Sequence, residues 1–183
     1  MSTTTATAPS TKVITGVVRL SFLHVWEAAA MTQGQPLKYS ASLIISKKDK
    51  KTIADINAAV AAATEQGKAK WGGKVPKNLK LPLRDGDEER DDAAYENSFF
   101  VNATSNNRPG VLDENKNEMM AKEDLYSGCY AKVSVNFYPF DQSGNKGIAC
   151  GLNNIMKVKD GEKLSGGASA EDDFADVDVE DDF

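Results

Sequence analysis

The sequence contains very few of the residues on which most catalytic and metal sites depend. His24 is its single histidine, and Cys129 and Cys150 are its two cysteines. A Ser-His-Asp or Cys-His device would depend on His24 alone, and a Cys/His zinc site lacks ligands. Neither a GxGxxG fingerprint nor a P-loop occurs. The sequence therefore predicts no catalytic residue, no metal site and no cofactor.

Long apolar runs are also absent. No stretch approaches the roughly 20 apolar residues that a membrane-spanning helix needs, so we expect no membrane association. Residues 1–11 are rich in Ser, Thr and Ala without the basic and apolar regions of a secretory signal. We expect a disordered N-terminus and reduced thiols inside a cell.

The net charge of −5 hides a strong asymmetry between the two parts of the chain. Eight acids and no base lie in residues 171–182. Without those eight, 19 of the 27 acids remain against 22 bases, which gives the rest of the chain a net charge of +3. A basic body with an acidic tail indicates a polyanionic partner and an interaction segment.

The hydrophobic pattern predicts a mainly β domain. One helix is expected from a cap at Ser46 or Asp49 to Gly67. Alternation predicts five strands, at residues 13–26, 37–46, 97–103, 129–140 and 147–159. Five strands and one helix suit a small closed or half-closed barrel. The predicted organisation is a disordered segment 1–11, a domain 12–159, and a flexible linker with the acidic tail at 160–183.

The strand at 129–140 carries the clearest candidate binding surface. Alternate residues from Cys129 to Phe137 are apolar and predicted to face inward. The opposite face presents Tyr130, Lys132 and Tyr138, as a surface that stacks bases and neutralises phosphates would. The alternative is that these tyrosines are strand formers packed under a loop.

Two loops carry clustered charge. Five lysines and Trp71 occur in residues 68–80 without an acid, so Lys70, Trp71 and Lys74 are predicted to contact a nucleic-acid backbone. Alternatively, Trp71 plugs the barrel beneath a solvated loop. The acidic loop at 84–92 raises a metal-dependent nuclease, centred on Asp85, Asp87 and Asp91, as an alternative function. Because these acids are consecutive, a salt-bridged loop is favoured.

The end of the chain is the sharpest signal in the sequence. Its acids repel one another, yet the segment contains Phe174 and ends in Phe183. A terminal phenylalanine offers a ring for an apolar pocket and a carboxylate for a nearby cation, so Asp181, Asp182 and Phe183 are predicted to bind partner proteins. The same polyanion can occupy the basic groove of its own body.

Several motifs, taken in order, resemble a tailed-phage family of single-stranded DNA-binding proteins. They are Arg19-Leu-Ser-Phe22, Tyr39-Ser-Ala-Ser-Leu-Ile-Ile-Ser46, Leu83-Arg-Asp-Gly-Asp-Glu-Glu-Arg90, Tyr126-Ser-Gly-Cys-Tyr130, Val135-Asn-Phe-Tyr-Pro-Phe140 and Asn145-Lys-Gly-Ile-Ala-Cys-Gly-Leu-Asn-Asn154. The resemblance implies an OB-like barrel, sequence-tolerant binding, a role in phage replication or recombination and a host-cell cytoplasmic location. The tail is similar to those of replication SSBs. The predicted helix follows the second strand, whereas OB folds usually place it between the third and fourth.

The sequence thus predicts a protein that coats single-stranded DNA, with possible self-association along it and replication or recombination partners on its tail. The predicted DNA contacts are Arg19, Lys38, Phe100, Tyr130, Lys132 and Tyr138 on the sheet, with Lys70, Trp71 and Lys74 on the loop. An RNA-binding or chaperone protein is the remaining alternative.

Overall fold

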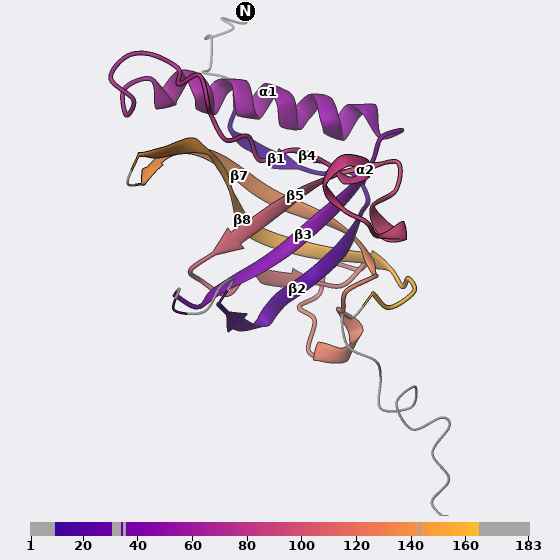
Figure 1. Ribbon diagram of the computed structural model, residues 1–183. Helices are drawn as coiled ribbons and strands as arrows, with labels where there is room; N and C mark the ends of the chain where they lie inside the picture. Colours follow the sequence, from indigo (N-terminus) through magenta and orange to yellow (C-terminus); the bar gives the residue numbers. More distant parts are fainter. Residues whose placement is uncertain (1–9, 31–33, 35, 143, 165–183) are drawn as a thin grey trace, which may run out of the picture.

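The computed structural model describes residues 10–30, 34, 36–142 and 144–164. The expected disorder of residues 1–9 and the acidic tail at 171–183 lie outside the described residues. Within them the sheet has eight strands, and one long helix lies across one end of it (Figure 1).

Five long strands close into a barrel, as the sequence predicts. They are β2 (Val18–Ala29), β3 (Lys38–Ser46), β5 (Ser98–Ser105), β7 (Tyr130–Gln142) and β8 (Asn145–Lys159). The ring runs β2, β3, β5, β8, β7 and back to β2. All neighbours are antiparallel except β5 and β8, which pair in parallel from Ala103 opposite Cys150. Two of the ladders that close the ring are short: Val18 and Arg19 of β2 pair with β7, and Ala103 and Thr104 of β5 pair with β8.

Three short strands extend this ring. β1 (Lys12–Ile14) pairs with β7, β4 (Arg84–Asp85) with β5, and β6 (Gly110–Leu112) with β8. The sequence pattern predicts one strand at residues 13–26, whereas the structure has two, β1 and β2, separated at Gly16. The Gly16 amide donates to Thr52 Oγ1 at 3.0 Å, and a Cβ there would lie 2.9 Å from Asp49 Oδ2. Contact with the start of the helix therefore separates the two strands.

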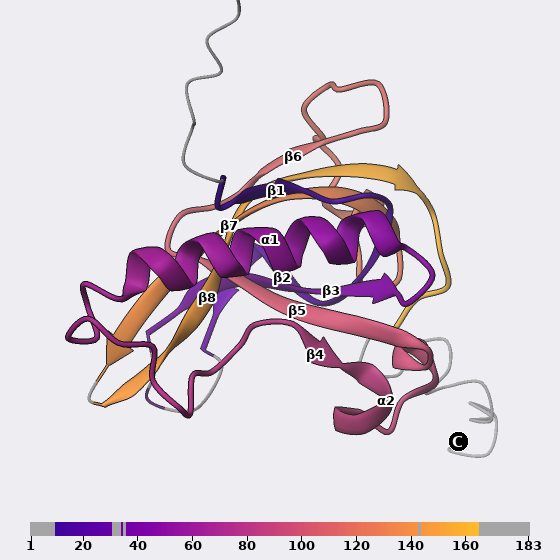
Figure 2. The ribbon, with the colours of Figure 1, turned by 90° about the horizontal axis from the view of Figure 1, so that it is seen from above.

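Helix α1 (Lys50–Gly67) begins where the sequence predicts. Asp49 caps it by accepting hydrogen bonds from the Thr52 amide at 3.2 Å and the Thr52 hydroxyl at 2.6 Å. Its buried side, which includes Ile56, Ala59 and Ala63, contacts β7, β1 and β8. Seen from above, α1 runs across the strands and covers one end of the barrel (Figure 2). This end is therefore unavailable to a ligand.

The helix lies between the second and third barrel strands. The predicted helix position, after the second barrel strand instead of the usual place between the third and fourth in OB folds, is therefore confirmed. The stretches predicted as loops contain elements too short to give a periodic pattern, namely β4, β6, the helix α2 (Gly86–Glu89) and two 3-10 turns at Ala93–Tyr95 and Lys122–Asp124. None of the described helices is long and apolar enough to cross a membrane.

The inward and outward assignments of the sequence hold for β7 but fail in part elsewhere. Ala131, Val133, Val135 and Phe137 are buried, as predicted. The alternation that buries Ala41 and Leu43 predicts an inward Leu37, but this residue precedes β3 and is 65% exposed. Ile14 and Phe22 alternate in sequence with the buried residues Val18 and Leu20, which predicts that they face inward. They are nevertheless 65% and 54% exposed. Irregularities in the first two strands, at Gly16 and after Ser21, change the alternation.

Both cysteines are buried and unpaired. Cys129 faces the core, as the alternation of its strand predicts. Burial raises the pKa of both thiols, so they remain protonated at neutral pH. Their role is therefore packing.

Candidate nucleic-acid interface

A strip of small or polar residues crosses the outward face of the barrel at right angles to its strands. Thr104 of β5 pairs with Gly151 of β8 on one side and with Ser40 of β3 on the other. Beyond them, Asn136 of β7 lies opposite Gly151, and His24 of β2 lies opposite Ser40. We call these five residues the transverse strip. Its middle residues, Ser40, Thr104 and Gly151, have short side chains and keep this part of the face low.

Aromatic rings stand at both ends of the transverse strip. Tyr138 is 41% exposed, and its ring lies beside Gly151, where an added Cβ would meet the ring at 3.5 Å. At the opposite end, Phe22 is 54% exposed beside His24. Exposed rings are the groups on which unpaired bases stack. The strip therefore has a stacking platform at each end.

The Phe22 end of the strip is hollowed into a cleft of about 280 Å³. Ser40, Ser42 and Asn102 supply its polar lining, and Phe22, His24 and Arg90 line it as well. Hydroxyl, amide and imidazole groups can all exchange hydrogen bonds with base edges. We call this hollow the β2–β3–β5 cleft.

Phe22 is held in an unusual backbone conformation. Its φ of 46° lies in the left-handed region, where a bulky L-residue is strained. It sits at an irregularity of β2 between Ser21 and His24, where the pairing with β3 shifts register. The irregularity brings the ring to the surface although the alternation of β2 predicts it inside. Strain of this kind is concentrated at functional sites.

Arg90 lies at the side of the β2–β3–β5 cleft among three aromatic rings. Its Cζ is 5.5 Å from the ring centroid of Phe22, 5.5 Å from that of Tyr95 and 4.9 Å from that of Phe100. Its Nε is buried, with no hydrogen-bond partner among the described residues. Aromatic contacts attract a guanidinium without neutralising its charge. Arg90 therefore keeps a positive charge for an anion in the cleft.

The acidic loop of the sequence is anchored by Lys47, the residue that follows β3. Lys47 Nζ lies 2.9 Å from Asp85 and 2.8 Å from Asp87, and Asp87 also accepts from the Asn97 amide at 2.9 Å. The Lys47 hydrogen bonds lower the pKa of both carboxyls, and the carboxylates raise the pKa of Lys47. The described residues contain no cluster of three metal-ligating side chains. Two of the three acids of the nuclease alternative therefore have a structural role.

The predicted row on β7 is present on the outer face. Tyr130, Lys132 and Tyr138 all point away from the buried side of the strand. Arg19 Cζ lies 5.6 Å from the Tyr130 ring centroid, and Lys159 Nζ lies 4.8 Å from it. Tyr130 is thus already in contact with two cations of its own chain, whereas Tyr138 borders the transverse strip. Contact of Arg19, Tyr130 and Lys132 with DNA stays a prediction.

Two predicted aromatic contacts need correction. Phe100 is 1% exposed, and its ring packs edge-on against Tyr95 at 5.2 Å, beneath Arg90. Trp71 is 6% exposed and donates from Nε1 to the Phe140 carbonyl at 3.1 Å. The alternative interpretation of Trp71 as a plug is therefore correct. Neither ring is free to stack on a base.

The lysines predicted to contact DNA are on the surface. Lys70 and Lys74 are exposed after α1, on a segment that Trp71 joins to β7 two residues from Tyr138. Lys38, partly buried, begins β3 two residues from Ser40. Cations thus flank both ends of the transverse strip.

Phe22, His24, Arg90 and Asn102 were missed by the sequence reasoning. Phe22 and Arg90 nevertheless end two of the motifs that carry the family resemblance, which was the available signal. The sequence contains no comparable signal for His24 or Asn102.

Replacing Trp71 by Phe tests the corrected role of this side chain. We expect the free energy of unfolding to fall by about 1 kcal/mol, because the Phe140 carbonyl loses a hydrogen bond while the ring still fills the barrel end. Affinity for DNA should not change. Denaturant unfolding and a DNA titration of the same variant measure both, and weaker binding by a normally folded variant would restore Trp71 as a contact.

The closed five-stranded barrel, with its parallel β5–β8 pair, places the protein among OB-like proteins. A sequence model of the family described as "Enterobacter phage Enc34, ssDNA-binding protein" matches residues 11–183. The chain belongs to this family.

Individual relatives agree with this assignment. "Putative protein p50" of Acyrthosiphon pisum secondary endosymbiont phage 1 is 30% identical over 163 residues, which cover 84% of this chain and 86% of that protein. The fold is similar to that of the single-stranded DNA-binding protein of bacteriophage Enc34 in complex with ssDNA (TM-score 0.76, 22% identity, 87% of this chain and 95% of that one). It is also similar to gp2.5, a single-stranded DNA-binding protein of bacteriophage T7 (TM-score 0.58, 14% identity, 86% and 97%).

Proposed function

We propose that this protein binds single-stranded DNA without strong sequence preference, along the transverse strip and in the β2–β3–β5 cleft. The observation that carries the proposal is the strip itself, with exposed rings at both ends and Arg90 beside the cleft. Bases stack on such rings only when they are unpaired, and the small floor residues allow the strand to lie close to the sheet. The family membership and the DNA-bound structural relative support the same function.

Each group of the site has a distinct part in binding. Phe22 and Tyr138 stack bases at opposite ends of the strip, while Asn102 bonds to base edges in the cleft. Arg90 and Lys38 neutralise phosphates near Phe22, and Lys70 and Lys74 do so near Tyr138. Because every base has a stacking face, binding of this kind tolerates any sequence.

The wider role follows from the tail and the sequence. We propose that the protein coats single strands during phage replication or recombination, in the host cytoplasm. The acidic tail ending in Asp181, Asp182 and Phe183 recruits partner proteins and competes with DNA for the basic surface. Self-association along the strand extends the coat.

Titration of a labelled mixed-sequence single strand and of its duplex tests the proposal. We expect the single strand to bind much more tightly, because only its bases can stack in the strip. Its affinity should fall with salt, with a log–log slope of about −3 for four phosphate contacts. Equal affinity for the two forms would contradict the proposal.

A further inference from the structure

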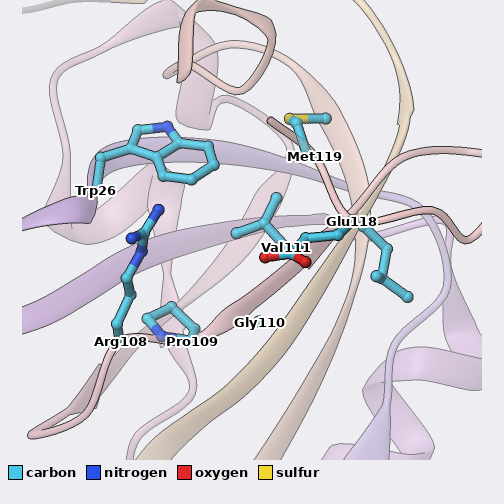
Figure 3. Close-up of a pocket in the computed structure, with 8 residues that line it drawn as sticks. Trp26, Arg108, Pro109, Gly110, Val111, Glu118 and Met119 are labelled. Atoms are coloured by element: carbon cyan, nitrogen blue, oxygen red, sulfur yellow. The ribbon is translucent and has the colours of Figure 1, made fainter. Parts of the chain in front are cut away.

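A second cavity lies at the end of the barrel away from α1. It measures about 400 Å³ and is lined by residues of β2 and of the segment that carries β6, among them Trp26, Arg108, Val111, Glu118 and Met119. Figure 3 shows the Arg108 guanidinium close to the Trp26 indole, with the Glu118 carboxylate next to Val111. A flat ring system, a cation and an acceptor pair therefore line one hollow.

The stacking surface of this cavity is fixed in orientation. Trp26 Nε1 donates to the Leu125 carbonyl at 3.2 Å, which sets the plane of the indole. Arg108 Cζ lies 5.0 Å from the indole ring centroid. Unpaired bases stack both on aromatic side chains and on guanidinium planes. The pair thus offers a preformed platform for one base.

The Glu118 carboxylate faces solvent, and no side chain of the described residues donates to it. Neither Glu118 nor Arg108 has an ion-pair partner within the described part of the chain, and Glu118 is exposed. An ionised carboxylate only accepts hydrogen bonds, through two oxygens. A ligand with two neighbouring N–H donors can therefore bond to both oxygens at once.

We propose that this cavity is a guanine-selective subsite for single-stranded DNA. Guanine carries N1–H and N2–H side by side on its Watson–Crick edge, which match the two carboxylate oxygens of Glu118. Thymine flanks its single N–H with two carbonyls that repel a carboxylate, while adenine and cytosine present their amino group beside an acceptor nitrogen. The edge is free only in an unpaired strand, so the subsite selects guanine in single strands.

The position of the subsite fits the proposed path of the strand, on which this inference rests. Trp26 follows Phe22 by four residues on β2, a distance of about 13 Å or less along the strand. A single strand that leaves the β2–β3–β5 cleft beyond Phe22 can therefore reach Trp26. The subsite adds a preference for one base to an interface that otherwise tolerates any sequence.

Three oligonucleotides of equal length test the subsite: oligo-dT, and oligo-dT with one central dG or one deoxyinosine. We expect the dG oligonucleotide to bind roughly fivefold more tightly than oligo-dT, the lower end of the range for a bidentate contact to a base, because Glu118 is exposed to water. Deoxyinosine keeps N1–H but lacks the N2 amine, so its affinity should fall between the two.

Glu118→Gln should abolish most of the dG preference while leaving oligo-dT binding intact. Glu114→Gln is the matched control, because it removes one exposed charge from the same segment outside this cavity. Equal binding of oligo-dT and dG, or an equal dG preference in both variants, overturns the subsite alone. Failure of the wild-type protein to bind any of the three would overturn the single-strand function itself.

Discussion

Replacing Phe22 by Gly or Ala should weaken single-strand binding by about 1–3 kcal/mol, the contribution of one stacked base. The two variants should differ in stability although they lose the same ring. At a φ of 46°, alanine retains the strain of a left-handed L-residue, whereas glycine adopts this region freely. We therefore expect Phe22→Gly to unfold with a free energy about 1 kcal/mol higher than Phe22→Ala.

Phe22→Tyr is the control for this pair, because it keeps both the ring and the strain. Its affinity should match that of the wild type. Binding is measured by titration with a labelled single strand, and stability by denaturant unfolding. Wild-type affinity in the Gly and Ala variants would show that Phe22 does not stack on DNA.

Deleting residues 171–183 should tighten single-strand binding, most strongly at low salt. The deletion removes all eight acids of the tail, which we propose compete with DNA for the cations around the cleft and strip. If the tethered tail has an effective concentration of about 1 mM and binds this surface with a dissociation constant of roughly 0.1 mM, it weakens DNA binding about tenfold. Salt screens the exposed charges and should reduce the difference.

Removing Phe183 alone separates the two roles of the tail. All eight acidic side chains remain, so DNA affinity should hardly change, whereas capture of a replication or recombination protein from infected-cell extract should be lost. Unchanged low-salt affinity after the full deletion would exclude competition by the tail. Retention of every partner without Phe183 would exclude docking through the terminal ring.

The barrel could be predicted from the sequence because its long strands alternate clearly. The apolar residues Ala131, Val133, Val135 and Phe137 define one face of β7, and Asp49 identifies the start of the helix. The short strands could not be predicted, because two or three residues, such as Arg84–Asp85, show no period. Their pairing is fixed by tertiary contacts.

The site was predictable only where it follows regular alternation. Tyr138 faces outward because β7 is regular up to it, and Lys38 follows from β3. The exposure of Phe22 could not be predicted, because a local irregularity of β2 reverses the direction of its side chain. No propensity rule anticipates a phenylalanine in the left-handed region. Phe100 shows the converse, since its outward position in β5 is covered by Tyr95 and Arg90 from a loop the sequence leaves unstructured.

Two double variants test most directly which surface binds DNA. Phe22→Ala with Arg90→Ala removes one ring and one cation from the β2–β3–β5 cleft, and Tyr130→Ala with Lys132→Ala removes the same from the far part of β7. In a titration with a labelled single strand, we expect the first variant to lose most of its affinity and the second to lose less. Strong loss in the second with normal binding in the first would contradict the cleft as the DNA-binding site.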